Sequence, residues 1–305
     1  MSCPVCGHDA FVLYREVESS ITTIPEGLDR GAHVHARIER CAECGLYRTV
    51  HLSDERTDDE LYALNSLSHD ASESKVSAAG ASATSSSDEL QLLNIKPPAT
   101  LLDIGCGAGQ FLLRAAAAGY DVQGIDPSPK SVAFVNDVLH FPARQGSFEI
   151  LRTDERFDVL SMLGVLEHID DPLAFLRAAT ERLNPDGELL VGVPNVESVN
   201  RRLSHLSTHD WDMFLEPGHL YHYGPATLRK LARNAGFAVG HWTTATITIR
   251  GKLPLIPRRY ASLERATRSS VAHVPLARRA YNASLRLLDN FHSGDMLFMV
   301  LTPEG

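Results

Sequence analysis

The sequence predicts an α/β fold in which a doubly wound parallel sheet, with helices on both faces, follows a small cysteine-containing unit. Two observations carry this prediction. From about residue 100 onward, short apolar strand-like segments alternate with helical ones, and two Cys-x-x-Cys pairs stand within the first 50 residues. With 305 residues and 44% apolar content, the chain can bury one sizeable core and carry a small appendage.

Residues 1–52 are predicted to form a zinc ribbon, because each end of this segment carries a Cys-x-x-Cys-Gly pattern with β-like stretches at 10–14 and 33–37 between them. A two-residue spacing places both sulfurs of a pair on one side of a tight turn, and two such turns supply four thiolates in a tetrahedron. The predicted ligands are Cys3, Cys6, Cys41 and Cys44. Two disulfides or a redox-active pair are the alternatives.

Residues 53–98 are predicted to be a helical and Ser/Ala-rich linker or lid. An acidic segment at 54–64 has the apolar spacing of a short helix, and the Ser- and Ala-rich segment at 66–87 has the composition of a loose connection. A helix is expected at 88–95, ended by the two prolines that follow.

Residues 99–305 are predicted to form the main domain. The expected strands are 100–104, 121–125, 143–146, 159–162, 188–193, 238–243 and 295–301, of which the third is weak. The expected helices are 110–118, 130–139, 173–183 and 227–235. Strands that alternate with helices in this way favour a parallel sheet.

The turn after the first of these strands reads Asp-x-Gly-x-Gly-x-Gly from Asp103 to Gly109. Glycines let the backbone pass close to a ligand, and the helix that opens at Gln110 points free N–H groups at it. Asp126, at the tip of the second strand, is placed to accept hydrogen bonds from a ribose diol. Because the carboxylate of Asp103 would repel a pyrophosphate, the pattern indicates a nucleoside that carries positive charge.

This pattern resembles motif I of the class I S-adenosylmethionine (SAM)-dependent methyltransferases. Further segments resemble the same family in the same order, at 124–128, 157–172, 183–195, 219–228 and 234–237. The resemblance covers roughly residues 90 to 250. It implies a Rossmann-like, mostly parallel seven-stranded sheet whose last strand is antiparallel and inserted near the edge, and SAM as the cofactor.

In the frame of this resemblance, Asp103 and the backbone of the glycine loop hold the methionine half of SAM, Asp126 holds the ribose, and Ser147 or Phe148 faces the adenine. The residues predicted to bind SAM are Asp103, Gly105, Cys106, Gly107, Gly109, Gln110, Asp126, Pro127, Ser147 and Leu163. The alternative for Cys106 is that the loop needs a small residue there for packing.

Glu167 and His168 follow the fourth strand, at the edge of the sheet where the methyl group is expected. They resemble the Glu-His pair of the ubiquinone-pathway O-methyltransferases, in which a further Glu three residues earlier helps to bind a divalent ion. Gly164 stands at that position here, so no Mg²⁺ site is predicted. His168 is a candidate general base, and a loop or capping residue near SAM is the alternative.

His219 and His222 are two further candidate bases. They lie in an aromatic segment whose rings suit a sugar-like or aromatic acceptor. Those rings are Trp211, Tyr221 and Tyr223. A structural aromatic cluster that braces the loop before the sixth strand is the alternative.

Charge is distributed unevenly along the chain. The net charge of −9 disfavours a nucleic-acid partner, whereas residues 250–286 carry nine Lys and Arg side chains against Glu264 alone. This basic insert predicts either an anionic substrate or an anionic membrane surface as partner, with a solvated helical cover of the sheet as the alternative. Five cysteines without a signal-peptide pattern indicate a cytoplasmic protein, peripheral to the membrane if the insert binds lipid.

The cysteine knuckles ahead of a methyltransferase pattern resemble the bacterial zinc-ribbon methyltransferases. Sugar C-methyltransferases share the knuckles but are longer, with an additional C-terminal domain. The favoured function is therefore O-methylation of a glycan, a lipid-linked sugar or a secondary metabolite. The alternatives are an rRNA base methyltransferase, whose knuckle is more compact, and a non-catalytic SAM-binding or zinc scaffold protein. The sequence leaves the oligomeric state open.

Overall fold

The computed structural model describes residues 2–20, 33–52, 89–204, 211–214, 216, 218–246 and 292–304. The predicted linker or lid lies outside these residues up to residue 88, and the basic insert 250–286 lies outside them entirely. Both therefore stay predictions. Within the described residues, no helix is both long and apolar enough to cross a membrane.

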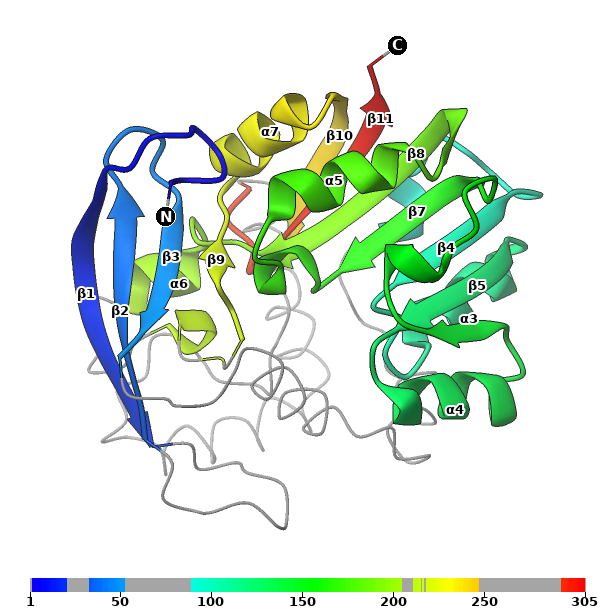
Figure 1. Cartoon of the computed structure of the whole chain (residues 1–305), viewed down its shortest axis with the longest axis horizontal. Coiled ribbons are helices and arrows are strands. Elements are labelled where there is room, and N and C mark those ends of the chain that lie inside the picture. The colour runs from blue at the N-terminus through cyan, green and yellow to red at the C-terminus, as the bar shows by residue number, and fades with distance from the viewer. Residues whose placement is uncertain are drawn as a thin grey trace, which may run out of the picture.

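The main domain is built on the predicted seven-stranded sheet, in the order β10-β11-β8-β7-β4-β5-β6 (Figure 1). Its strands are β4 (Thr100–Ile104), β5 (Asp121–Asp126), β6 (Ala143–Gln145), β7 (Phe157–Leu163), β8 (Leu183–Pro194), β10 (Phe237–Ala245) and β11 (Met296–Pro303). The strands from β8 to β6 pair in parallel, whereas β11 is antiparallel to both of its neighbours. The expected insertion of the last strand near the edge is thus confirmed.

Helices cover both faces of this sheet, as a doubly wound fold requires. They are α3 (Gln110–Ala118), α4 (Pro129–Asp137), α5 (Pro172–Thr180) and α7 (Pro225–Asn234), and the domain also contains the short helix α6 (Val199–Ser204). Leu102 and Leu160 belong to the core cluster that contains the buried residues of α5 and α7. Their chain neighbours Leu101 and Val159 belong to the cluster with those of α3 and α4. This alternation follows from the two-residue period of a strand.

Local capping signals fix where several helices begin and end. The α4 helix begins after Ser128, whose hydroxyl accepts a hydrogen bond from the N–H of Ser131 at 3.3 Å. The α5 helix begins after Asp171, whose carboxylate accepts from the N–H of Ala174 at 3.0 Å. Each has a proline in its first turn, and α3 ends at Gly119, which has a left-handed φ of 102°.

The helix predicted at 88–95 is only a short 3₁₀ turn, η1 (Glu89–Leu92). The buried carboxylate of Glu188 accepts hydrogen bonds from the N–H groups of Asn94 and Ile95, at 2.8 and 3.0 Å. These N–H groups are therefore not available to extend a helix, and the chain turns toward β4 instead.

The N-terminal unit is an antiparallel ribbon that docks on the main domain. Its strands are β1 (Phe11–Ser20), β2 (His33–Cys41) and β3 (Tyr47–His51), of which β3 was not predicted. The ribbon sheet continues into β9 (Tyr221–His222) of the main domain, in the order β1-β2-β3-β9, and Figure 1 shows β9 beside the blue strands. Val5 and Leu46 of the ribbon lie in the same core cluster as α5 and α7.

Candidate functional site

The loops after β4 and β5 meet at the carboxyl edge of the sheet through Asp126. One oxygen of its carboxylate accepts a hydrogen bond from the N–H of Gly107, and the other accepts from the N–H of Ser128, both at 2.8 Å. The side chain is buried. Asp126, the residue predicted to bind the ribose, is therefore held against the glycine loop. In an open α/β sheet a nucleoside would lie at this point.

The glycines of this loop have different physical tasks. Gly105, Gly107 and Gly109 all have left-handed φ angles, of 70°, 49° and 73°. A Cβ atom on Gly105 would lie 2.5 Å from a methyl group of Val165, so that glycine permits close packing against the loop after β7. A Cβ atom on Gly107 would meet no protein atom within 4 Å, so the loop faces open space there. That open face fits a bound ligand.

Asp103 lies on β4 and is buried beside Ser161 of β7, whose hydroxyl donates a hydrogen bond to it at 2.7 Å. Burial raises the pKa of Asp103 to about 7, and the nearby carboxylate of Asp126 adds to this. A ligand with positive charge would compensate the buried carboxylate. Ser161 was not singled out from the sequence, although it is a polar residue between the apolar Leu160 and Met162.

The other predicted SAM residues have the following places in the fold. Cys106 is buried, and its sulfur would lie 2.7 Å from a Cβ atom on Gly124, which agrees with a packing role. Ser147 precedes the short turn η2 (Phe148–Ile150). Phe148 packs on Phe175 at 4.8 Å between ring centroids and belongs to the core, which leaves Ser147 as the adenine candidate. Three further predicted residues lie at the ends of elements: Gln110 at the start of α3, Pro127 after β5 and Leu163 at the end of β7.

His168 and His219 come together although 50 residues separate them in the sequence. Their ring centroids lie 4.7 Å apart. Nδ1 of His168 is 2.8 Å from the carbonyl oxygen of Gly218, and Nδ1 of His219 is 3.1 Å from that of Met213. Because a carbonyl oxygen only accepts hydrogen bonds, each Nδ1 carries the proton, and the lone pair of each neutral ring is on Nε2.

Glu167 completes this cluster. Ligand atoms of Glu167, His168 and His219 all lie within 4.8 Å of one another, and the Glu167 side chain is only 2% exposed. Burial raises the pKa of Glu167 to about 8, and its Oε2 atom has no hydrogen-bond partner among the described residues. These donors could hold a divalent cation. The sequence did not indicate such a set, because nothing local shows that His219 lies beside Glu167.

His222, the third candidate base, lies apart from this pair. Its ring is 6.3 Å from that of His219, and its Nε2 atom is 2.9 Å from the hydroxyl of Thr49 in the ribbon. Burial, with the positive charge of Arg201, lowers the pKa of His222 to about 3. His222 therefore stays neutral near pH 7 and is a weak proton acceptor. Its 4.7 Å contact with the Phe214 ring agrees with the aromatic-cluster interpretation.

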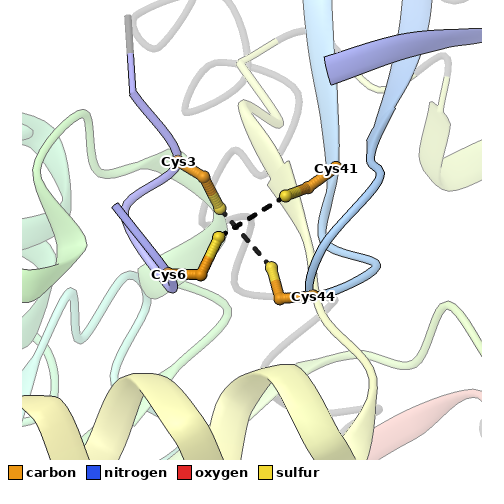
Figure 2. Close-up of side chains that lie close together, drawn as sticks. All are labelled: Cys3, Cys6, Cys41 and Cys44. Carbon is orange, nitrogen blue, oxygen red and sulfur yellow. Dashed lines mark hydrogen bonds between the residues drawn. The ribbon is translucent and has the colours of Figure 1, made fainter. Parts of the chain in front are cut away.

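The four ribbon cysteines point toward one another from two turns (Figure 2). The sulfur atoms of Cys3 and Cys44, and those of Cys6 and Cys41, are each 3.5 Å apart, and all four lie within 4.8 Å of one another. Sulfur atoms around a tetrahedral zinc are about 3.8 Å apart, given a Zn–S bond of about 2.3 Å. The donor set and its spacing therefore fit zinc.

The thiols of this cluster differ in acidity. Burial acts to raise the pKa of Cys41, but hydrogen bonds from the backbone N–H groups of Cys44 and Glu43 and from neighbouring thiols bring it down to about 7. Burial raises the pKa of Cys44. Thiolate is the form that binds metal, so a bound cation would have to displace the remaining protons.

Comparison with known proteins agrees with this geometry. A family model described as a methyltransferase domain matches residues 83–241. The chain is 34% identical over 170 residues to the ubiquinone biosynthesis O-methyltransferase of Azorhizobium caulinodans, a match that spans 48% of this chain and 67% of the relative. It is also 34% identical over 145 residues to the protein of the same name from Rhodopseudomonas palustris, spanning 41% of this chain and 57% of that one.

A similar solved structure supports the fold. It is a chain of the Haloferax volcanii complex between the Trm112 methyltransferase activator and a methyltransferase. The TM-score is 0.52 at 16% identity, and the match covers 77% of this chain and 96% of that chain. Since the family model matches more than half of the chain, and the loop, the two buried acids and the strand order all agree with it, this chain belongs to the class I SAM-dependent methyltransferases.

Proposed function

We propose that this methyltransferase transfers the methyl group to an oxygen atom of a glycan, a lipid-linked sugar or a small secondary metabolite. The observation that carries the proposal is the pair His168 and His219, whose rings lie 4.7 Å apart with both Nδ1 atoms held by backbone carbonyl groups. A hydroxyl acceptor has a proton to lose, and an imidazole with an oriented lone pair is suited to take it. The names of the relatives from Azorhizobium and Rhodopseudomonas also favour O-methylation.

In this mechanism SAM, when bound, supplies a methyl group on a good leaving group. Asp126 would hold the ribose of SAM, and Asp103 would compensate the positive charge of the methionine half. His168 takes the acceptor proton at Nε2, and His219 borders the same space. Val165 packs over Gly105, which places the loop that carries His168 directly against the cofactor loop. Most of the acceleration then comes from alignment of donor and acceptor.

The acceptor class can be tested by incubating the protein with methyl-labelled SAM and four substrate fractions: nucleotide-sugars, glycolipids, hydroxylated aromatic metabolites and rRNA. We expect label in one of the first three fractions, released by conditions that cleave methyl ethers. Label in rRNA would establish the alternative of base methylation. Label on carbon or nitrogen of the acceptor would contradict O-methylation.

The proposed base predicts the behaviour of His168→Ala and His219→Ala. Each variant should retain wild-type SAM affinity, and at least one should lose turnover by about 10²-fold or more, the usual contribution of a general base. His241→Ala, an exposed position on β10, is the matched control and should behave as wild type. Normal turnover in both variants would sink the assignment, even if His222→Ala lost turnover.

Asp103 gives SAM binding a predictable pH dependence. With its pKa raised to about 7, Asp103 is neutral below that pH and negative above it, and the negative form attracts a cationic ligand. Affinity should therefore rise with pH, by about tenfold between pH 6 and pH 8 for a single titrating group. Calorimetry on wild type and Asp103→Asn measures this. If the SAM affinity of Asp103→Asn depends on pH as in wild type, Asp103 is not the source of the pH dependence. The control is Asp121→Ala, at the exposed start of β5, which should behave as wild type.

We also propose that the four ribbon cysteines hold one structural zinc. A set of four thiolates leaves no open coordination position, so the metal contributes to folding rather than to chemistry. The sulfur separations of 3.5 Å between two facing turns support this assignment, because a disulfide would bring a pair of sulfur atoms to about 2 Å.

Elemental analysis should find one zinc per chain in the wild-type protein. The Cys41→Ser variant should lose both the zinc and the native ribbon structure. A metal-free preparation with a native ribbon would refute the zinc site. The same measurement tests whether Glu167, His168 and His219 bind a cation. A second bound cation that disappears in Glu167→Gln and in His168→Ala and His219→Ala would show that the two histidines serve as metal ligands, and the histidine base would then be wrong.

A further inference from the structure

The ribbon provides the strand partner of the segment that follows His219. Tyr221 and His222, the two residues of β9, pair with Arg48 and Tyr47 of β3. The N–H of Thr49 donates a hydrogen bond to the carbonyl of Leu220 at 2.9 Å, which extends the pairing by one residue toward His219. Figure 1 shows β9 between the ribbon strands and the main sheet.

The side chain of Thr49 strengthens this connection. Its hydroxyl lies 2.9 Å from Nε2 of His222, a histidine that is only 2% exposed. On its other sides the His222 ring meets Phe214 at 4.7 Å and Trp211 at 6.0 Å between ring centroids. The hydroxyl of Thr49 and the rings of Phe214 and Trp211 together fix the orientation of His222.

A second set of ribbon contacts reaches the residues that orient His219. Tyr14 and Tyr47 pack on Phe214, at 6.3 and 6.1 Å between ring centroids. Arg201 donates hydrogen bonds to both tyrosine hydroxyls, at 3.2 and 2.8 Å, and so fixes this pair. The carbonyl of the residue before Phe214, Met213, accepts the hydrogen bond from Nδ1 of His219.

The cysteine knuckles are themselves tied to the main domain. The side chain of Asn234, at the end of α7, donates a hydrogen bond to the carbonyl of Val5 at 2.7 Å. Cys3 and Cys41 belong to the core cluster that contains Leu231 of α7. Loss of the knuckle fold would therefore loosen both the ribbon and its contacts with β9.

We propose that the ribbon positions the acceptor site: Thr49, with the pair Tyr14 and Tyr47, holds residues 211–214 and 218–222 so that His219 faces His168. This inference rests on the proposed function, because His219 matters for turnover only if the histidine pair does the chemistry. Thr49 is a positioning residue here, since it acts through His222 and the chain next to it rather than on the substrate.

The first test measures kinetics of Thr49→Val, which removes the hydroxyl at nearly constant volume. We expect kcat to fall about tenfold, because small misplacements of a catalytic group are costly, with SAM affinity unchanged. Thr49→Ser keeps the hydroxyl and should therefore retain most of the wild-type kcat. If Thr49 acted by packing alone, Thr49→Ser would not be more active than Thr49→Val. Thr302→Val, on β11 away from the ribbon, is the matched control and should leave kcat unchanged.

The second test does not depend on activity. The chain has two tryptophans, so Trp242→Phe leaves Trp211 as the only one. Trp211 is buried, and its emission should shift to longer wavelength when the segment separates from the ribbon and water enters. The shift is expected in Thr49→Val and, more strongly, after zinc is removed by chelation. Tyr47→Phe, which deletes one partner of Arg201 but keeps the ring, should give a smaller shift and serves if Thr49→Val does not fold.

The outcomes separate this inference from the proposed function. A Trp211 shift together with loss of kcat supports the positioning role. An unchanged Trp211 emission after zinc removal and in both variants overturns it, whatever the turnover. A shift with normal kcat also overturns the role in catalysis. His219→Ala, measured in parallel, reports on the proposed base alone: normal turnover there rejects the base while the Trp211 result still decides whether the ribbon holds the segment.

Discussion

The carboxylate of Asp126 is the contact on which the cofactor side of the molecule depends. It joins the glycine loop after β4 to the turn after β5 by accepting from Gly107 and Ser128, and it is buried while doing so. Asp103 is buried close by, and the two carboxylates repel each other. Such a site is costly without positive charge, so the same geometry that forms the loop also selects a cationic nucleoside. The proposed proton transfer uses a different part of the site, the loop after β7 and the residues before β9.

Much of the main sheet could be predicted because its signals are local. The strand at 100–104 and the helix at 110–118 have the predicted bounds, since an apolar run, a glycine turn and a helix closed by Gly119 stand next to each other in the sequence. Local signals also misled. The β8 strand begins at Leu183, five residues before the predicted start, because Asn, Pro, Asp and Gly at its beginning are typical of a turn.

The parts that could not be predicted depend on pairing between distant residues. Thr49 and His222 are 173 positions apart, and nothing in either segment specifies the other as its strand partner. The histidines were identified by residue type, but their roles depend on burial. His222 is enclosed and its pKa lies near 3, whereas His168 is only half-buried beside His219. Sequence reasoning can thus identify candidate bases, whereas the fold is needed to distinguish a candidate base from a buried structural histidine.

The charge state of Glu167 bears on what the histidine cluster can do. A carboxyl group whose pKa is about 8 is mostly protonated at neutral pH, so Glu167 brings little negative charge to His168 and His219. Such a neutral carboxyl group is compatible with the proposed proton transfer to an imidazole. A divalent cation would reverse this by removing the proton from Glu167, and it would be held more firmly by a second carboxylate. Gly164 stands where the ubiquinone-pathway pattern has that carboxylate, and this absence favours proton transfer over metal binding at the site.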